Sequence, residues 1–411
     1  MTPVRPILSA LLRRKSGALL VAAQVALTLA VLCNAVFVAT DRLGQARQPS
    51  GTDEAALFHV AMITPGADVA PFDRQRADEA LVRAVPGVRG VAWINQMPLA
   101  QSGNNSSLAT QRGATDTVSA AVYAGAHDAA AVLGLRIVEG RGFTAADEVD
   151  IDRRQSRQWP AHALATRALA ERLFPDGASA VGRVVYAGTG PDDPAITIVG
   201  VVDRLVTPWG PVSWNPGDPK GESGLLLPWR QESEGLLAVR ADPAQIDAVR
   251  TAVAERLRSA VPGRIVRDTP TMAETRERRY RSDTWLARLM TVVIGLLLVM
   301  TAGGIVGLAS LWVTQRRKQI GVRRALGARR VDIVMHFVVE NLMITGLGVA
   351  VGLTLAVALN QALTRVTTLA PLPGTLLAGS GVAMLVLGVA AVLAPALRAA
   401  RVPPAEATRS V

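Results

Sequence analysis

The sequence has little of what most enzymes and secreted domains rely on. It contains one cysteine and four histidines in 411 residues, and aromatic side chains make up 4% of it. A single cysteine, Cys33, excludes an internal disulfide, so an exported part of the chain must be stabilised by its own core. The histidines form no paired metal-ligand spacing, which argues against a metal site; they are His59, His127, His162 and His336.

Several catalytic motifs are also missing. The chain has no G-x-x-x-x-G-K-[ST] motif, so we expect it to supply no phosphate loop of its own for ATP hydrolysis. It also lacks H-E-x-x-H and G-x-S-x-G, which are signatures of zinc proteases and of α/β-hydrolases. Acidic residues gather at 145–152, AADEVDID, where we expect a solvated loop. The sequence therefore predicts a protein that is not an enzyme and that binds no cofactor itself.

Long uncharged stretches dominate instead. Half of the residues are hydrophobic and the mean hydropathy is +0.28. A helix needs roughly 20 apolar residues to cross a bilayer, and four segments meet that length. We predict membrane spans at residues 16–40, 285–313, 332–360 and 375–397. The first span follows a basic triplet as a signal peptide would, but its length favours a retained helix.

The charges predict how these spans are oriented. Before the first span, between the second and third, and after the fourth, the chain carries 14 basic and two acidic residues; residues 41–284 carry 28 basic and 30 acidic ones. Positive loops stay in the cytoplasm, so we predict cytoplasmic segments 1–15, 314–331 and 398–411. The Arg-rich, Lys-poor composition suggests a bacterial source, and we expect the membrane to be the bacterial inner membrane. Residues 41–284 would be periplasmic, with a second periplasmic loop at 361–374. The basic residues lack aromatic partners or a recognisable module, so we expect no nucleic-acid binding.

The segment between the first two spans is predicted to be a mixed α and β domain. Short β-branched stretches predict strands, and amphipathic spacing predicts two helices. The strands are expected at 56–63, 90–94, 196–202 and 236–240, and the helices at 72–85 and 243–261. Residues 101–117 and 207–224 are rich in Gly, Pro, Asn and Ser, and we expect loops there. Trp209, Trp214 and Trp229 lie in or beside the second loop, where burial under the loop is a more ordinary role than partner contact.

Residues 316–352 carry a resemblance to a known family. Their sequence, RRKQIGVRRALGARRVDIVMHFVVENLMITGLGVAVG, closely resembles the signature of MacB/FtsX-type (type VII) ABC transporter permeases, in which a basic block precedes a span with an early glutamate. GLRIVEGRGFTAADE, ALAERLFPDGASAVGRVV, LLLPWR and the ending PALRAARVPPAEATR resemble further family elements in the same order.

The resemblance implies a fold and a set of partners. The fold is an α-helical membrane protein with four transmembrane helices and an α+β MacB-like periplasmic domain between helices 1 and 2. Two permease chains, identical or homologous, would pair and bind a cytoplasmic ABC ATPase dimer, which is expected to be a separate polypeptide and to hold ATP and Mg²⁺. Motion of the periplasmic domain would follow ATP hydrolysis (mechanotransmission). Membrane lipid, a periplasmic adaptor and an outer-membrane channel are further expected partners.

The same resemblance assigns the ATPase-coupling residues to the basic loop. They are Arg316, Arg317, Lys318, Gln319, Ile320, Gly321, Arg323, Arg324, Ala325, Leu326, Gly327, Arg329 and Arg330. Gln319 departs from the family, which usually has Glu there, so one expected charge pair at the coupling helix is missing; an identical and a non-identical partner permease both stay open. Glu340 lies inside the third predicted span, where an unpaired acid is costly. We expect it to bind the basic loop, with His336 as the second choice.

Glycines in two spans have a spacing that permits close helix contact. Gly303 and Gly307 lie four residues apart in the second span, and Gly348 and Gly352 in the third. Because the family pairs through its first two spans, we expect the Gly303 pair to lie at the dimer interface.

Three functions are compatible with these features. The first is a permease that exports or extracts a peptide, antibiotic or lipoprotein-like substrate. The second is an FtsX-like regulator that transports nothing and activates an envelope hydrolase, and the third is a membrane receptor with a periplasmic ligand-binding domain. The large external segment favours the first, since the regulatory type generally has a smaller one. A receptor would need a cytoplasmic output domain, which the segment 398–411 is too short to form.

Overall fold

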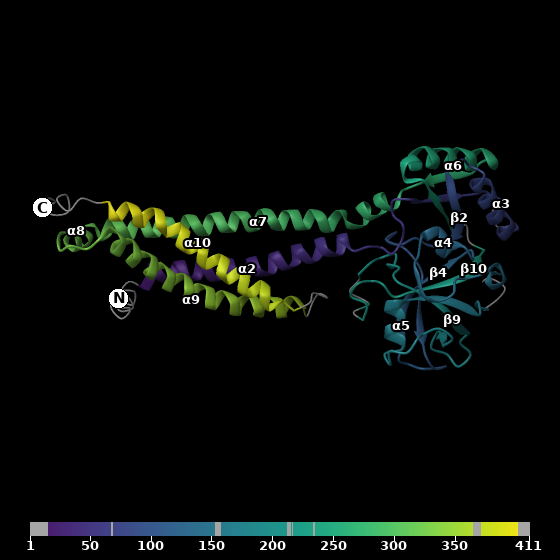
Figure 1. The fold of residues 1–411 in the computed structure, drawn as a ribbon, viewed down its shortest axis with the longest axis horizontal. Coiled ribbons are helices and arrows are strands. Elements are labelled where there is room, and N and C mark those ends of the chain that lie inside the picture. Colours follow the sequence, from purple (N-terminus) through teal and green to yellow (C-terminus); the bar gives the residue numbers. More distant parts are fainter. Residues whose placement is uncertain are drawn as a thin grey trace. The chain divides into compact units, whose positions relative to one another are not determined.

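The computed structural model describes residues 15–66, 69–152, 158–211, 215, 217–232, 235–364 and 371–401. The chain divides into two compact units (Figure 1). The helical unit combines Met1–Gly44 with Asp283–Val411, and the α+β unit is Gln45–Ser282. Each unit is described by itself.

Four long helices in the described residues are apolar enough to cross a membrane. They are α2 (Lys15–Arg47), α7 (Met272–Gln315), α9 (Arg330–Thr364) and α10 (Gly374–Ala400). The four predicted spans fall inside these helices. Helix α7 begins well before its predicted span because Thr271 and Glu274 form a reciprocal cap: Thr271 N–H donates to Glu274 Oε2 at 3.0 Å and Glu274 N–H donates to Thr271 Oγ1 at 3.1 Å.

Helix α2 packs closely against α9. A Cβ on Gly348 would lie 2.7 Å from the carbonyl oxygen of Ala22, and one on Gly352 would lie 2.9 Å from that of Ala26. The two backbones therefore approach as closely as glycine allows. Further along, Asn34 Nδ2 donates to Ala356 O at 3.1 Å, a hydrogen bond that takes the place of water in an apolar layer.

Helix α2 also packs against α7, and α9 against α10. The hydroxyls of Thr28 and Thr301 lie 2.9 Å apart, and Gln24 Nε2 donates to Met300 O at 3.1 Å. Between α9 and α10, Asn341 Nδ2 donates to Gly388 O at 2.9 Å. The short helix α8 (Arg317–Ala325) connects α7 to α9.

The α+β unit contains two lobes. The first is a four-stranded antiparallel sheet of β1 (Leu57–Ile63), β2 (Val88–Ile94), β11 (Leu236–Ala241) and β12 (Ile265–Asp268), in the order β12-β1-β11-β2. Helix α3 (Pro71–Arg83) joins β1 to β2, and α6 (Ile246–Ala260) joins β11 to β12. This is the split β-α-β arrangement of ferredoxin-like folds, here with a long insertion between its second and third strands.

The insertion forms the second lobe, in which six strands close a ring of pairings. They are β3 (Asn105–Ala109), β4 (Val118–Gly125), β7 (His162–Thr166), β8 (Val184–Ala187), β9 (Ala195–Val202) and β10 (Gly224–Gln231). Their order is β4-β3-β8-β9-β7-β10, and β10 returns to pair with β4. Two short strands attach outside the ring: β5 (Ile137–Gly140) on β9, and β6 (Val149–Ile151) on the end of β10. Helix α5 (Arg167–Leu173) follows β7.

Alternation along the strands separates two apolar clusters. Phe58 and Val60 on β1 pack with Val253 and Leu257 of α6, while Leu57 packs on the other face with Leu133 of α4 (Ala129–Leu133). Successive strand residues point to opposite faces, so the sheet is covered on both sides. The first cluster also includes Trp229 and other residues of the second lobe, so the core is continuous between the lobes.

All four expected strands and both expected helices of this unit are present, but two loop expectations were wrong. Residues 101–117 contain strand β3, whose pairing with β4 and β8 outweighs the low strand propensity of its Asn and Ser residues. Residues 145–152 contain a 3-10 turn, η1 (Ala145–Asp147), and strand β6. Trp229 is buried in the core and Trp209 is half-buried, whereas Trp214 lies outside the described residues.

Candidate functional site: a basic helix anchored to an intramembrane glutamate

Helix α8 carries most of the predicted coupling residues. It begins at Arg317, ends at Ala325, and is closed by Gly327, whose φ of 95° is the left-handed conformation that glycine adopts readily. The Leu326 N–H donates to Val322 O at 3.0 Å, and the Ala328 N–H donates to Arg323 O at 3.1 Å. The chain then restarts as α9, where the Arg329 N–H donates to Asp332 Oδ2 at 2.9 Å.

The predicted coupling residues divide into an inner and an outer set. Ile320 and Gly321 are buried, and Arg316 and Arg324 are half-buried. The remaining ones are exposed: Arg317, Lys318, Gln319, Arg323, Ala325, Leu326, Gly327, Arg329 and Arg330. The exposed face also carries Val322, so a cationic surface with two apolar side chains, Val322 (52% exposed) and Leu326 (83% exposed), is available for contact. Sequence reasoning missed Val322.

Glu340 pairs with the basic loop, as expected. Arg316 Nη1 lies 2.7 Å from Glu340 Oε2 and Nη2 lies 3.0 Å from Oε1, which is a two-point guanidinium–carboxylate contact. Glu340 is 3% exposed, so its carboxylate is shielded from solvent, whereas the Arg316 side chain is 19% exposed. His336, the second choice, packs with its ring edge-on to Phe337, the ring centroids being 6.1 Å apart.

The two glycine pairs have different surroundings. Gly348 and Gly352 are buried against α2 of the same chain, so their role here is internal packing. Gly303 and Gly307 are exposed on α7, and among the described residues no atom lies within 4 Å of a Cβ built on either. Gly303 and Gly307 therefore form an exposed strip on α7 that carries no side chains.

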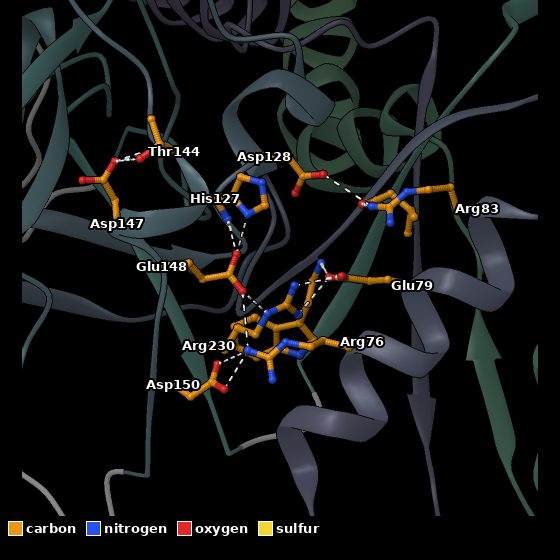
Figure 2. Close-up of polar contacts among 12 residues, drawn as sticks. Arg76, Glu79, Arg83, His127, Asp128, Thr144, Asp147, Glu148, Asp150 and Arg230 are labelled. Carbon is orange, nitrogen blue, oxygen red and sulfur yellow. Dashed lines mark hydrogen bonds and ion pairs between the residues drawn. The ribbon is translucent and has the colours of Figure 1, made fainter.

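The α+β unit holds a second polar site, a buried ion-pair network (Figure 2). Arg230 on β10 binds Glu79 of α3 through Nη1 and Nη2 at 2.9 and 2.8 Å, and its Nε binds Glu148 at 2.5 Å. Glu148 also accepts hydrogen bonds from the backbone N–H of His127 at 2.8 Å and pairs with His127 Nδ1 at 2.6 Å. Arg230 and Glu79 are only 3% and 5% exposed, so these charges are compensated by one another rather than by water.

Three side chains at helical spacing on α3 bind residues of the second lobe. Arg76 binds Asp150 at 2.7 Å, Glu79 binds Arg230, and Arg83 lies 3.5 Å from Asp128 (Figure 2). Residues three and seven positions apart share one helix face. That face therefore connects the two lobes through charge pairs.

Hydrogen bonding lowers the pKa of two carboxylates of this region, Glu148 and Asp147. Burial acts to raise the pKa of Glu148, but the bonds from His127 and Arg230 overcome it and lower the pKa to about 2. Asp147 accepts from Arg141 at 2.7 and 3.0 Å, from Thr144, and pairs with His162 Nδ1 at 2.6 Å. The Arg141 contact holds the pKa of Asp147 far below its usual range. Residues 145–152 are thus a paired structural element and not the solvated loop that the sequence suggested.

Sequence reasoning missed this network. The available signals were the spacing of Arg76, Glu79 and Arg83 in an otherwise ordinary helix, and one arginine, Arg230, inside the apolar stretch LLLPWRQ. A charged residue in a buried strand requires a partner. Within the described residues, no group of three or more His, Cys, Asp or Glu side chains is arranged to hold a metal ion.

Four apolar helices, with an α+β unit inserted between the first and second of them, define a four-span membrane protein with an extracytoplasmic domain. Comparison with known protein families identifies the family to which this membrane protein belongs. The profile described as MacB-like periplasmic core domain matches residues 23–256, more than half of the chain, and the one described as FtsX-like permease C-terminal matches residues 291–404. The chain belongs to the MacB/FtsX-type family of ABC exporter permeases.

Curated relatives agree with this assignment. A macrolide export ATP-binding/permease protein MacB of Agrobacterium fabrum is 27% identical over 317 residues, which is 74% of this chain and 45% of the relative. A pyoverdine export ATP-binding/permease protein PvdT of Pseudomonas syringae is 24% identical over 294 residues, 70% of this chain and 43% of the relative. The chain thus spans less than half the length of these relatives.

A solved structure is also similar. The periplasmic region of MacB from Actinobacillus actinomycetemcomitans aligns to 56% of this chain and 94% of its own length, with 13% sequence identity and a TM-score of 0.34.

Proposed function

We propose that the chain is the permease part of an ABC exporter in the bacterial inner membrane. An ATP-hydrolysing partner, which holds ATP and Mg²⁺, binds the exposed face of α8 in the cytoplasm. Its movement passes through the membrane helices to the α+β unit, which acts on cargo on the periplasmic side (mechanotransmission). The excess of basic residues near α8 and the ends of the chain supports a cytoplasmic location for both termini.

The exposed face of α8 is the observation that carries this proposal. Nine of the thirteen residues that the resemblance assigns to ATPase coupling are exposed on α8 and the segment that follows it, so they are accessible to a partner. The two exposed apolar side chains, Val322 and Leu326, lie among the basic residues of this face and suit a protein groove as well as a charged surface.

The cargo and the other partners belong to the same proposal. The relatives are named for the export of macrolides and of pyoverdine. We propose an antibiotic, peptide or lipoprotein-like cargo, and a second permease chain that packs against the exposed strip of α7 at Gly303 and Gly307. A periplasmic adaptor and an outer-membrane channel would complete an export path.

The test is recovery of the partner from native membranes. The full chain is purified in mild detergent and the associated proteins are identified by mass spectrometry, with a phosphate-loop ATPase as the expected partner. The double variant Lys318→Glu/Arg323→Glu reverses two charges on the exposed face of α8 and should lose that partner. The control Arg256→Glu/Arg258→Glu makes the same charge change on exposed residues of α6 and should keep it. Equal recovery with both variants would refute the docking role of α8, and recovery of an envelope hydrolase without an ATPase would favour the regulator.

A further inference from the structure

Three residues at a spacing of four fix α8 to the rest of the helical unit. Arg316 binds Glu340 of α9, as described above. Ile320 is 5% exposed and packs with residues of α9 and α10, among them Phe337 and Ala396. Arg324 Nη1 donates to Ala400 O, at the last residue of α10, at 3.2 Å. Residues four apart lie on one face of a helix, so α8 has an anchoring face that is distinct from its exposed face.

Arg316 occupies the junction between two helices. Helix α7 ends at Gln315 and α8 begins at Arg317, and Arg316 has non-helical φ and ψ of −104° and 11°. Its backbone N–H still donates to Trp312 O at 3.0 Å, in the last turn of α7. The residue at which the chain changes direction is therefore also the one that is bound to α9.

Intramembrane acids often form ion or substrate sites, which would be a different role for Glu340. Two observations argue against that role. Both carboxylate oxygens are occupied by the guanidinium of Arg316. The cavity that Glu340 borders, together with Trp312, Phe337 and Asn341, has a volume of about 10 Å³. A space of that size holds one water molecule at most.

We propose that Arg316 and Glu340 are positioning residues of the coupling helix: their ion pair is a strut that passes a displacement of α8 to α9. Without it, movement of α8 would be absorbed by bending at the α7–α8 junction. The two-point contact resists rotation as well as separation, because both nitrogens and both oxygens are held. This inference rests on the proposed function, since it requires an ATPase that moves α8.

The inference is separable from a purely structural role by the choice of substitutions. Removing one partner leaves a buried, unpaired charge and destabilises a protein strongly, whereas replacing both partners with apolar residues of similar volume is often neutral. The double variant Arg316→Met/Glu340→Leu should therefore fold and bind the ATPase through the unchanged exposed face of α8, but lack the strut. The double variant Arg316→Glu/Glu340→Arg restores an ion pair of reversed polarity.

The experiment uses the full chain with its ATPase in lipid nanodiscs. Hydrogen exchange of residues 45–282 is measured by mass spectrometry with and without ATP and vanadate, together with ATPase recovery and the melting temperature. We expect the Met/Leu variant to keep its ATPase partner and its melting temperature. Its nucleotide-dependent difference in hydrogen exchange should be smaller than that of the wild type by roughly fivefold to tenfold, the size typical of coupling mutations. The charge-swapped variant should regain most of it.

The control is Arg183→Met/Asp176→Leu, which removes an ion pair of 2.6 Å in the α+β unit and should keep the full exchange difference. A full exchange difference in the Met/Leu variant would overturn the strut and leave the proposed function standing. An ATPase-bound wild-type chain with no nucleotide-dependent exchange difference would overturn the proposed function, and the strut with it.

Discussion

Replacing Arg230 with methionine should destabilise the α+β unit sharply, although the two side chains have similar length. The substitution leaves Glu79 and Glu148 buried, with side-chain exposures of 6% and 11%, and removes the cation that lies between them. Breaking a buried ion pair from one side costs about 3–5 kcal/mol. For a unit of this size that corresponds to a fall in melting temperature of roughly 6–20 °C.

Tryptophan fluorescence of the full chain in detergent is a suitable assay. The backbone N–H of Trp93 donates to Glu79 Oε1 at 2.6 Å, and Trp229 precedes Arg230 on β10, so both tryptophans are adjacent to the network and their fluorescence reports on it. The matched control is Arg183→Met, whose partner Asp176 is exposed and whose loss should change stability by no more than about 1 kcal/mol.

Two further results would confirm or refute the reasoning. Adding Glu79→Gln and Glu148→Gln to Arg230→Met removes the unpaired charges and should recover part of the melting temperature. In the wild type, the low pKa of Glu148 contributes stability that is complete above pH 4.5 and lost as the pH falls toward about 2. If Arg230→Met melts within 2 °C of the wild type at neutral pH, the network does not hold the unit together, and its charges must be hydrated in solution.

Three other predictions follow from individual positions. Burial lowers the pKa of His59 to about 4, so the histidine is neutral in the folded unit. The free energy of unfolding should therefore fall by about 3 kcal/mol as the pH drops from 6.5 toward 4, because only the unfolded chain takes up the proton in that range. The variant His59→Leu should abolish that loss, which is measured by thermal melts at a series of pH values. Gly348→Ala pushes a methyl group toward the Ala22 carbonyl and should destabilise the helical unit by about 1–3 kcal/mol, measured by detergent unfolding, whereas Gly346→Ala, with open space around it, should not. Gly303→Ile/Gly307→Ile should reduce the fraction of dimer in light scattering, whereas Gly379→Ile, also on an open helix surface, should leave it unchanged.

Patterns that repeat along the chain allowed much of the fold to be predicted. The four spans follow from the length of their predominantly apolar stretches, and the amphipathic helix at 243–261 from the spacing of Ile246, Val249, Val253 and Leu257. Eight strands were missed: β3, β4, β5, β6, β7, β8, β10 and β12. Six of them have five residues or fewer, and all, including the longer β4 and β10, are stabilised by pairing with neighbours distant in sequence rather than by their own composition. The closed ring of the second lobe depends on such pairings and has no local signature.

The coupling residues show the same limit within a single helix. The resemblance grouped thirteen residues together, because a shared motif does not show which way each side chain points from the helix. The structure separates them by helix face: Arg316, Ile320 and Arg324 contact the helical unit, while Lys318 and Arg323 are exposed. The four-residue spacing of the first three was visible in the sequence, but a basic helix gives no indication of which of its arginines are anchors until their partners, Glu340 and Ala400 O, are placed.

Arg230 and Arg316 differ in what surrounds them, and this difference decides what each can do. Arg230 lies within a strand that pairs on both sides and binds carboxylates from two other segments, so a shift of any one of them breaks several contacts at once. Such a site stabilises one arrangement. Arg316 lies where α7 ends, and within the described part of the chain it binds one carboxylate, that of Glu340 on α9. A pair of that kind keeps α8 and α9 at a fixed separation without locking them into a larger core, so the two helices can move together, which is the property that a moving connection needs and a rigid core does not.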